Sequence, residues 1–291
     1  MKAAPFWYRR ASSVSEAVSL LADHDGEPKL LAGGQSLVPM MAFRLARPDL
    51  LVDINPIGEL AFLQGGGEGE PLRIGALTRT AELEDPSQFS GAWSVVPELA
   101  TRIGHLPIRR RGTVGGSLAH ADPAAELPVF ALAVDAELAC TGPGGTRVVP
   151  AADFFSGMFQ TALDGDEMLT EVRCPALPPG TAATLVEFAR RAGDFALVLV
   201  VAALSVTDGR IAEARLAVGG VGPVPLRARA AEEVLRGQAM SAALFADAAN
   251  AAQRDIDPGS DIHASAAYRR RLTDVLCRRA LTAAASRASV T

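Results

Sequence analysis

Cysteine is scarce in this chain of 291 residues, and its three cysteines, Cys140, Cys174 and Cys277, lie far apart. None belongs to a CxxC pair, so the sequence predicts neither a zinc site nor an iron–sulfur cluster bound by this chain alone. An odd, scattered set of cysteines also argues against a disulfide framework and is typical of a reducing compartment.

The chain also has no excess of positive charge. The formal net charge is -5 and the isoelectric point is about 5.5, so the chain has no electrostatic footprint for nucleic acid. Two short arginine clusters, at 109–111 and 269–271, are expected on solvated or subunit-facing surfaces. The first could help to steer an anionic ligand or hold a neighbouring subunit, and the sequence does not decide between the two.

Long hydrophobic runs are absent as well. The longest, FALVLVVAAL at 195–204, is too short to span a bilayer, and the first residues lack the apolar segment of a secretory signal. We therefore expect a cytoplasmic protein without membrane insertion. Apolar residues make up 49% of the chain, which is enough for a sizeable core.

The patterns that are present indicate an α+β fold. A capping-box signature at 13–16 predicts a helix to about residue 23, and Asp208-Gly209 is a hairpin signal. The prolines and glycine at 175–180 mark the clearest boundary. We expect strands at 29–32, 50–54 and 72–77, a hairpin loop at 65–70, a helix at 93–103, a helix or strand at 129–138, β-rich runs at 184–191, 195–209 and 210–221, and helices after about 227.

Two similar glycine motifs stand about eighty residues apart, LAGGQSL at 31–37 and TVGGSLAHAD at 113–122. Without Cβ atoms, successive backbone N–H groups can point into one concavity and bind phosphate oxygens. Gln35, Ser36, Thr113 and Ser117 would add side-chain donors. Two such loops could clamp a pyrophosphate from both sides.

More specific kinds of binding or catalytic site fit these residues less well. Neither motif matches GxGxxG or the GxxxxGK[ST] phosphate loop. Ser117, His120 and Asp122 lie within six positions, which makes the geometry of a hydrolytic triad difficult. No second histidine or cysteine stands at ligand spacing from His120 or His105, so neither is expected to bind a metal. Asp122 and Glu126 are better explained as acceptors for sugar hydroxyl groups.

These motifs carry a resemblance to a known family. The runs KLLAGGQSLVPMMAFRLARPDLLVDIN and IRRRGTVGGSLAHADPAAELP closely resemble the FAD-binding medium subunit of molybdenum hydroxylases, a family that includes the carbon monoxide dehydrogenase medium subunit and the flavin domain of xanthine dehydrogenase. The likeness continues through ADFFSGMFQTALDGDEMLTEVRCP, EFARRAGDFALV and DIHASAAYRRRL, and so covers nearly the whole chain.

The resemblance implies an FAD-binding fold of the vanillyl-alcohol-oxidase (PCMH) type at 1–177, with subdomains at about 1–57 and 58–177. It implies a C-terminal domain at 178–291 of the carbon monoxide dehydrogenase flavoprotein type, with an antiparallel sheet and helices that cover the flavin ring. The implied FAD-binding residues are Ala32, Gly33, Gly34, Gln35, Ser36 and Leu37 on one side of the pyrophosphate, Thr113, Gly115, Gly116 and Ser117 on the other, Asp122 and Glu126 by the sugar portions, Met168 and Leu169 beside the adenine or ring system, and Arg190 and Phe195 near the flavin end. Relatives often carry tyrosine where this chain has Phe195, so a hydroxyl donor is absent there.

The resemblance also supplies partners. It implies a small subunit with two 2Fe-2S clusters and a large subunit with the molybdenum cofactor, assembled as a dimer of heterotrimers. Electrons would pass from the clusters through FAD in this chain to an external acceptor. This agrees with the residues, among which no catalytic acid, base, nucleophile or metal ligand stands out.

Two alternatives remain open. A stand-alone flavin-dependent oxidoreductase would need a substrate base near the flavin, which the sequence does not identify. A flavin-free binding or assembly module would be free to lose its glycine loops, yet both are intact. The substrate of the assembled enzyme (carbon monoxide, an N-heteroaromatic compound or an aldehyde) and the terminal acceptor are not determined by this sequence.

Overall fold

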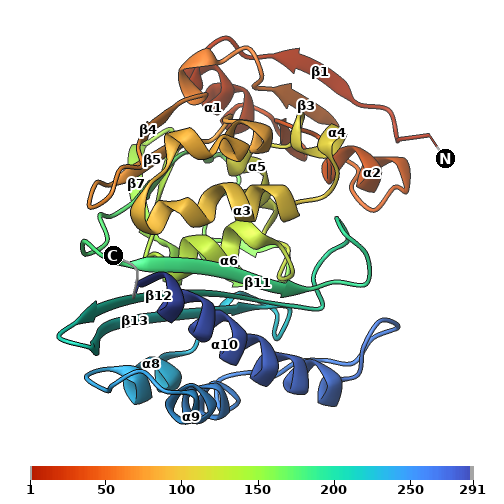
Figure 1. The fold of residues 1–291 in the computed structure, drawn as a ribbon. Helices are drawn as coiled ribbons and strands as arrows, with labels where there is room; N and C mark the ends of the chain where they lie inside the picture. Colours follow the sequence, from red (N-terminus) through yellow and green to blue (C-terminus); the bar gives the residue numbers. More distant parts are fainter. Residues whose placement is uncertain (1, 289–291) are drawn as a thin grey trace.

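The computed structural model of the chain describes residues 2–288, and its three larger sheets follow one another along the chain as stacked layers (Figure 1). The N-terminal layer is a parallel sheet in the order β1 (Trp7–Arg10), β3 (Leu50–Asp53) and β2 (Pro28–Leu31), with helices α1 (Val14–Ala22) and α2 (Leu37–Ala42). Helix α1 begins as predicted, because the Ser13 hydroxyl accepts from the Glu16 N–H at 3.1 Å.

The middle layer is an antiparallel five-stranded sheet. Its order is β4 (Leu63–Gly65), β5 (Leu72–Gly75), β10 (Met168–Cys174), β6 (Glu137–Gly142) and β7 (Gly145–Pro150). The predicted loop at 65–70 joins β4 and β5 as a hairpin. The helices of this layer are α3 (Val95–Arg102), α4 (Leu106–Arg109), α5 (Val114–His120), α6 (Glu126–Ala133) and α7 (Ala151–Phe154), with 3-10 turns at Gly58–Leu60, Thr80–Glu84, Pro86–Gln88 and Gly91–Ser94, and a small hairpin of β8 (Phe155–Gly157) and β9 (Gln160–Thr161).

The C-terminal layer is an antiparallel sheet in the order β11 (Ala182–Phe188), β12 (Val198–Thr207), β13 (Arg210–Gly219) and β14 (Leu226–Arg227). Helices α8 (Arg229–Leu235), α9 (Ala242–Ala252) and α10 (Ala266–Ala288) cover one face of this sheet (Figure 1). The β12–β13 turn is the predicted Asp208-Gly209 hairpin, and both residues have positive φ, 51° and 71°. The α+β class is as predicted.

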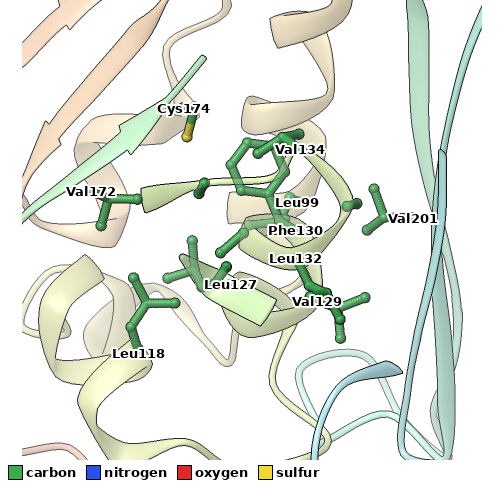
Figure 2. Close-up of a cluster of buried hydrophobic side chains, with 14 of the residues drawn as sticks. Leu99, Leu118, Leu127, Val129, Phe130, Leu132, Val134, Val172, Cys174 and Val201 are labelled. Atoms are coloured by element: carbon green, nitrogen blue, oxygen red, sulfur yellow. The ribbon is translucent and has the colours of Figure 1, made fainter. Parts of the chain in front are cut away.

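Helix α6 joins the middle and C-terminal layers. All eight of its residues are buried, and Figure 2 shows its side chains between Val172 and Cys174 of β10 on one side and Val201 of β12 on the other. A helix buried on every side has no polar face, so its sequence lacks the amphipathic period. This explains why residues 129–138 could be predicted only as helix or strand: they contain the end of α6 and the start of β6.

Strand β12 accounts for the long apolar run. Its alternate residues pack in two cores: Leu199, Val201 and Ala203 face α6 and the middle layer, whereas Val200 and Ala202 pack with the C-terminal helices. A strand buried on both faces carries apolar residues at every position. The run is thus a central strand, and no helix within residues 2–288 is both long and apolar enough to cross a membrane.

Candidate functional site

The two glycine motifs meet in space. Loop 1 (residues 31–37) leads from β2 into α2, and loop 2 (residues 111–117) leads into α5. A Cβ atom added to Gly33 would overlap the Arg111 carbonyl oxygen and lie 2.8 Å from the Gly112 Cα atom, and one added to Gly116 would lie 3.9 Å from the Ala32 side chain. Glycine at position 33 therefore permits the two backbones to touch.

A pair of polar side chains fixes this contact. The Asn55 amide donates to the Ala32 carbonyl of loop 1 at 2.9 Å and accepts from an Arg79 Nη at 2.6 Å. The other Arg79 Nη donates to the Arg111 carbonyl of loop 2 at 2.5 Å. We call this arrangement the Asn55–Arg79 brace, and because it bonds to the backbone of both loops it sets their spacing.

Loop 1 offers unused donors. Gly34 has φ +70°, and α2 begins with bonds from later residues to the Gly34 and Ser36 carbonyls. Within the described part of the chain, the backbone N–H groups of residues 33–36 donate to no protein acceptor. The loop is half-exposed apart from the exposed Gln35, whose side chain folds back onto the Gly33 carbonyl at 3.0 Å. Loop 1 thus has the free backbone donors that the predicted binding of an anion requires.

Loop 2 differs from the expectation of a second set of free N–H groups. The N–H groups of Val114, Gly115 and Ser117 donate to the carbonyls of Thr78, Ala76 and Thr113, and the Gly116 N–H donates to the Thr113 hydroxyl at 3.1 Å. These bonds anchor the first turn of α5. Within the described chain, Thr113 is the one residue of loop 2 whose N–H group has no protein acceptor, and Thr113 is buried. Loop 2 therefore offers a ligand fewer free backbone donors than loop 1.

A cavity of about 450 Å³ opens beside loop 1. Its lining consists of Tyr8, Leu31, Ala32, Gly33, Gly34, Gln35, Val38, Pro39, Asp53, Asn55 and Arg111. Burial by itself would raise the pKa of Asp53, but hydrogen bonds from Tyr8 and Asn55 outweigh it and lower the pKa, so this carboxylate stays ionised. The cavity thus combines free backbone donors with one acidic and one basic side chain.

The predicted sugar acceptors follow α5. Asp122 is half-buried and accepts from the Ala124 N–H at 2.9 Å, whereas Glu126, at the start of α6, is only 5% exposed. Burial raises the pKa of Glu126 to about 8, with smaller contributions from the Glu187 and Asp122 carboxylates. At neutral pH the neutral Glu126 carboxyl can both donate to and accept from a hydroxyl group.

Arg190 and Phe195 lie on the β11–β12 connection, residues 189–197, which rises from the C-terminal sheet towards the layer above (Figure 1). Both are exposed, Phe195 by 61%. A Cβ atom added to Gly193 would lie 2.6 Å from the His105 ring, so this connection reaches the segment just before α4. The structure therefore places the predicted flavin-end residues beside the middle layer.

Arg269, in the DIHASAAYRRRL motif, holds the base of that connection. This buried side chain pairs with Asp261 at 2.7 Å and donates to the carbonyls of Leu197 at 2.5 Å and Gly220 at 3.1 Å. The Gly220 N–H in turn donates to the Pro123 carbonyl at 2.9 Å. Arg269 thus ties the C-terminal layer to the segment that carries Asp122.

Met168 and Leu169 are placed differently. Their side chains on β10 are buried in the hydrophobic cores of the N-terminal and middle layers. Burial in a core leaves no side-chain surface of these residues open to a ligand, so any contact would come from their backbone.

The described residues contain no group of three His, Cys, Asp or Glu side chains that could hold a metal ion. In the same part of the chain, no hydrogen bond joins the side chains of Ser117, His120 and Asp122. The His120 ring lies 5.0 Å from the Phe159 ring, and burial lowers its pKa. The arrangement does not form a hydrolytic triad.

Sequence reasoning missed the brace and part of the cavity lining, namely Tyr8, Asp53, Asn55 and Arg79. Asp53 and Asn55 carried a usable signal, because they end the LLVDI strand and the carboxyl ends of parallel strands commonly bind ligands. Arg79 carried none, since its role depends on partners 24 and 32 positions away.

Comparison with known proteins identifies this architecture. Residues 3–177 match the family model of the FAD binding domain in molybdopterin dehydrogenase, and residues 183–284 match that of the CO dehydrogenase flavoprotein C-terminal domain. The chain is 40% identical to the 6-hydroxypseudooxynicotine dehydrogenase complex subunit alpha of Paenarthrobacter nicotinovorans, over 100% of this chain and 98% of the relative. It is 35% identical to the carbon monoxide dehydrogenase medium chain of Hydrogenophaga pseudoflava, over 97% and 98%.

Solved structures agree. A carbon monoxide dehydrogenase from Hydrogenophaga pseudoflava superposes with a TM-score of 0.94 at 37% identity, covering 99% of both chains, and the quinoline 2-oxidoreductase of Pseudomonas putida 86 with a TM-score of 0.93 at 35% identity, covering 99% of both. These matches confirm the resemblance carried by the glycine motifs. The chain therefore belongs to the family of FAD-binding medium subunits of molybdenum hydroxylases, as an oxidoreductase subunit whose cofactor is FAD.

Proposed function

We propose that this chain is the electron-transfer subunit of a heteromeric molybdenum hydroxylase, and that it passes electrons from the 2Fe-2S clusters of a partner through FAD to an external acceptor. The observation that carries the proposal is the contact of loop 1 with loop 2, which the Asn55–Arg79 brace holds beside the free N–H groups of loop 1. When bound, FAD supplies reversible uptake and release of electrons. This chain's residues bind and orient it.

The binding residues take these roles. Loop 1, from Ala32 to Leu37, presents N–H groups to the pyrophosphate, and Thr113, Gly115, Gly116 and Ser117 form the facing wall. Asp122 and Glu126 accept from, or in the neutral form of Glu126 donate to, sugar hydroxyl groups. Arg190 and Phe195 close over the flavin end from the β11–β12 connection, and the backbone of Met168 and Leu169 borders the site.

The partners are proposed from the kind of protein to which the relatives belong. Their names include a complex subunit alpha, a medium subunit and a medium chain. These names support assembly with other subunits. We propose that the partners are a small iron–sulfur subunit and a large molybdenum subunit, arranged as a dimer of heterotrimers.

The relatives' names also indicate where the substrate is recognised. They refer to enzymes for 6-hydroxypseudooxynicotine, caffeine, nicotine, carbon monoxide and glyceraldehyde, although each of these relatives is 35–40% identical to this chain. Such different molecules are unlike in size and polarity, so one conserved subunit does not select among them. We infer that the substrate binds in another subunit of the complex.

The test has two stages. The purified chain is titrated with FAD and its visible spectrum recorded, with the expectation of a perturbed flavin spectrum and of FAD release on denaturation. The chain is then co-expressed with the small and large subunits, and reduction of an artificial acceptor is compared with that of a complex lacking this chain. A chain that binds no FAD even within the complex, or a complex that reduces the acceptor equally well without it, would refute the proposal.

A further inference from the structure

The arginine cluster at 109–111 has three members with different surroundings. Arg109 is committed to the protein: its Nε donates to the Glu84 carboxylate at 2.7 Å, its Nη1 donates to the Gly104 carbonyl at 3.0 Å, and its side chain is 12% exposed. Arg110 is exposed and does not line the cavity beside loop 1. Arg111 is exposed and lines that cavity.

The backbone of Arg111 is held in place by a hydrogen bond, whereas its side chain is not used by the protein. Its carbonyl accepts from Arg79 in the Asn55–Arg79 brace and lies against Gly33. Among residues 2–288, its guanidinium makes no hydrogen bond or ion pair. A planar group with five N–H donors is therefore held at the cavity with nothing in the protein to bind.

The electrostatics of the cavity favour an anionic partner for this group. Among the described residues that line the cavity, Arg111 is the one cationic side chain and Asp53 is the one carboxylate. Asp53 already accepts from Tyr8 and Asn55 and remains ionised, so it would repel a phosphate. The N–H groups of loop 1 contribute only dipoles, and those of residues 114–117 in loop 2 are occupied. A full positive charge at this place would add to the attraction of these dipoles for a doubly charged pyrophosphate.

We propose that Arg111 binds the pyrophosphate of FAD and makes the site selective for a dinucleotide flavin over a flavin without phosphate. The inference rests on the proposed function, because it assumes that the cavity beside loop 1 receives the phosphates of FAD. Guanidinium and phosphate match in geometry, since two parallel N–H groups can donate to two phosphate oxygens. Arg109 contributes to the fold instead, and Arg110 has no part in binding.

The test compares Arg111→Met with Arg110→Met, a matched control one position away with the same charge change. Each full-length apo protein is titrated with FAD and with riboflavin, which lacks phosphate, at two salt concentrations. We expect Arg111→Met to weaken FAD binding by about 10- to 100-fold, as for the loss of hydrogen bonds to a charged group. Riboflavin binding should not change, and FAD binding should become less sensitive to salt.

The control variant should stay within about twofold of the wild type for both ligands. Arg111→Lys keeps the charge but loses the two parallel N–H donors, so its FAD affinity should lie between those of Arg111→Met and the wild type. The substitutions leave the Arg111 carbonyl and its bond to Arg79 in place, and circular dichroism checks that each variant folds. FAD affinity unchanged in Arg111→Met, or an equal loss of riboflavin affinity, would overturn this inference alone. A wild-type chain that binds no FAD would overturn the proposed function with it.

Discussion

Gly33→Ala is the substitution that most directly tests the contact between the two loops. The new Cβ atom would overlap the Arg111 carbonyl oxygen and lie 2.8 Å from the Gly112 Cα atom, and both neighbours are backbone atoms that no side-chain rotation can move. Carbon atoms in ordinary contact are about 3.5–4.0 Å apart, so one loop must shift by roughly 1 Å. Gly33 does not have positive φ, and the effect therefore comes from this contact and not from backbone strain.

The cost of overpacking a well-packed place by one methyl group is about 1–3 kcal/mol. The apo chain can relieve the clash by moving loop 1 away from loop 2, since loop 1 is half-exposed. The proposed FAD site requires the original spacing of the loops, so most of the cost should appear on binding. Because about 1.4 kcal/mol corresponds to a factor of ten, we expect FAD affinity to fall by roughly 5- to 150-fold.

The assay is a fluorescence titration of the apo variant with FAD, together with its unfolding in urea. Gly58→Ala is the control, because a Cβ atom at Gly58 would meet nothing within 4 Å. The control should bind FAD as the wild type does. If Gly33→Ala binds FAD within about twofold of the wild type, the contact between the loops does not shape the site and the reasoning fails.

Three further predictions concern the surroundings of the site. Asn55→Ala removes the bond to loop 1 and leaves Arg79 with one backbone partner, so FAD affinity should fall about 5- to 20-fold, whereas the affinity for riboflavin, which lacks the pyrophosphate, should fall less; an unchanged FAD titration would show that the brace is dispensable. Burial raises the pKa of Glu126 from 4.5 to about 8, so its stabilising contribution is complete below pH 4.5 and is lost as the pH rises to about 8. Urea unfolding of the apo wild type should therefore weaken across this range by up to about 1.4 kcal/mol per pH unit more than that of Glu126→Gln, and parallel pH profiles would contradict the assigned burial effect. Arg269→Met removes an ion pair and two hydrogen bonds to carbonyl groups, so the free energy of unfolding should fall by about 2–3 kcal/mol and the 189–197 connection should be cleaved faster by proteases; equal cleavage of both proteins would argue against its anchoring role.

The parts of the fold that could be predicted are those that depend on neighbours in the chain. The Ser13 cap and the Asp208-Gly209 turn use bonds and dihedral angles within four residues, so sequence patterns indicated them correctly. Residues 129–138 could not be resolved, because α6 is buried among α3, α5, α7, β12, β13 and β14 and carries no periodic signal.

The same division applies to the site. The glycine motifs by themselves indicated a phosphate-binding pair of loops and, through their resemblance, the family that the comparisons confirm. The sequence could not show that loop 1 keeps its N–H groups free while those of loop 2 bond to Thr78, Ala76 and Thr113. Whether a donor is free depends on which acceptors the folded chain brings to it.

The sequence by itself determined which residues can adopt tight turns, which runs are apolar, and that its three cysteines lack the spacing of a cluster motif. Only the tertiary structure decided that Asn55 and Arg79 join the two loops. It also decided that Arg109 donates to Glu84, whereas Arg111 lines the cavity. The physical reason is that turn geometry and hydrophobicity are properties of a residue and its near neighbours. Burial, ion pairing and the presence of hydrogen-bond donors without a protein acceptor instead depend on contacts between residues tens of positions apart. These contacts exist only once the layers have packed.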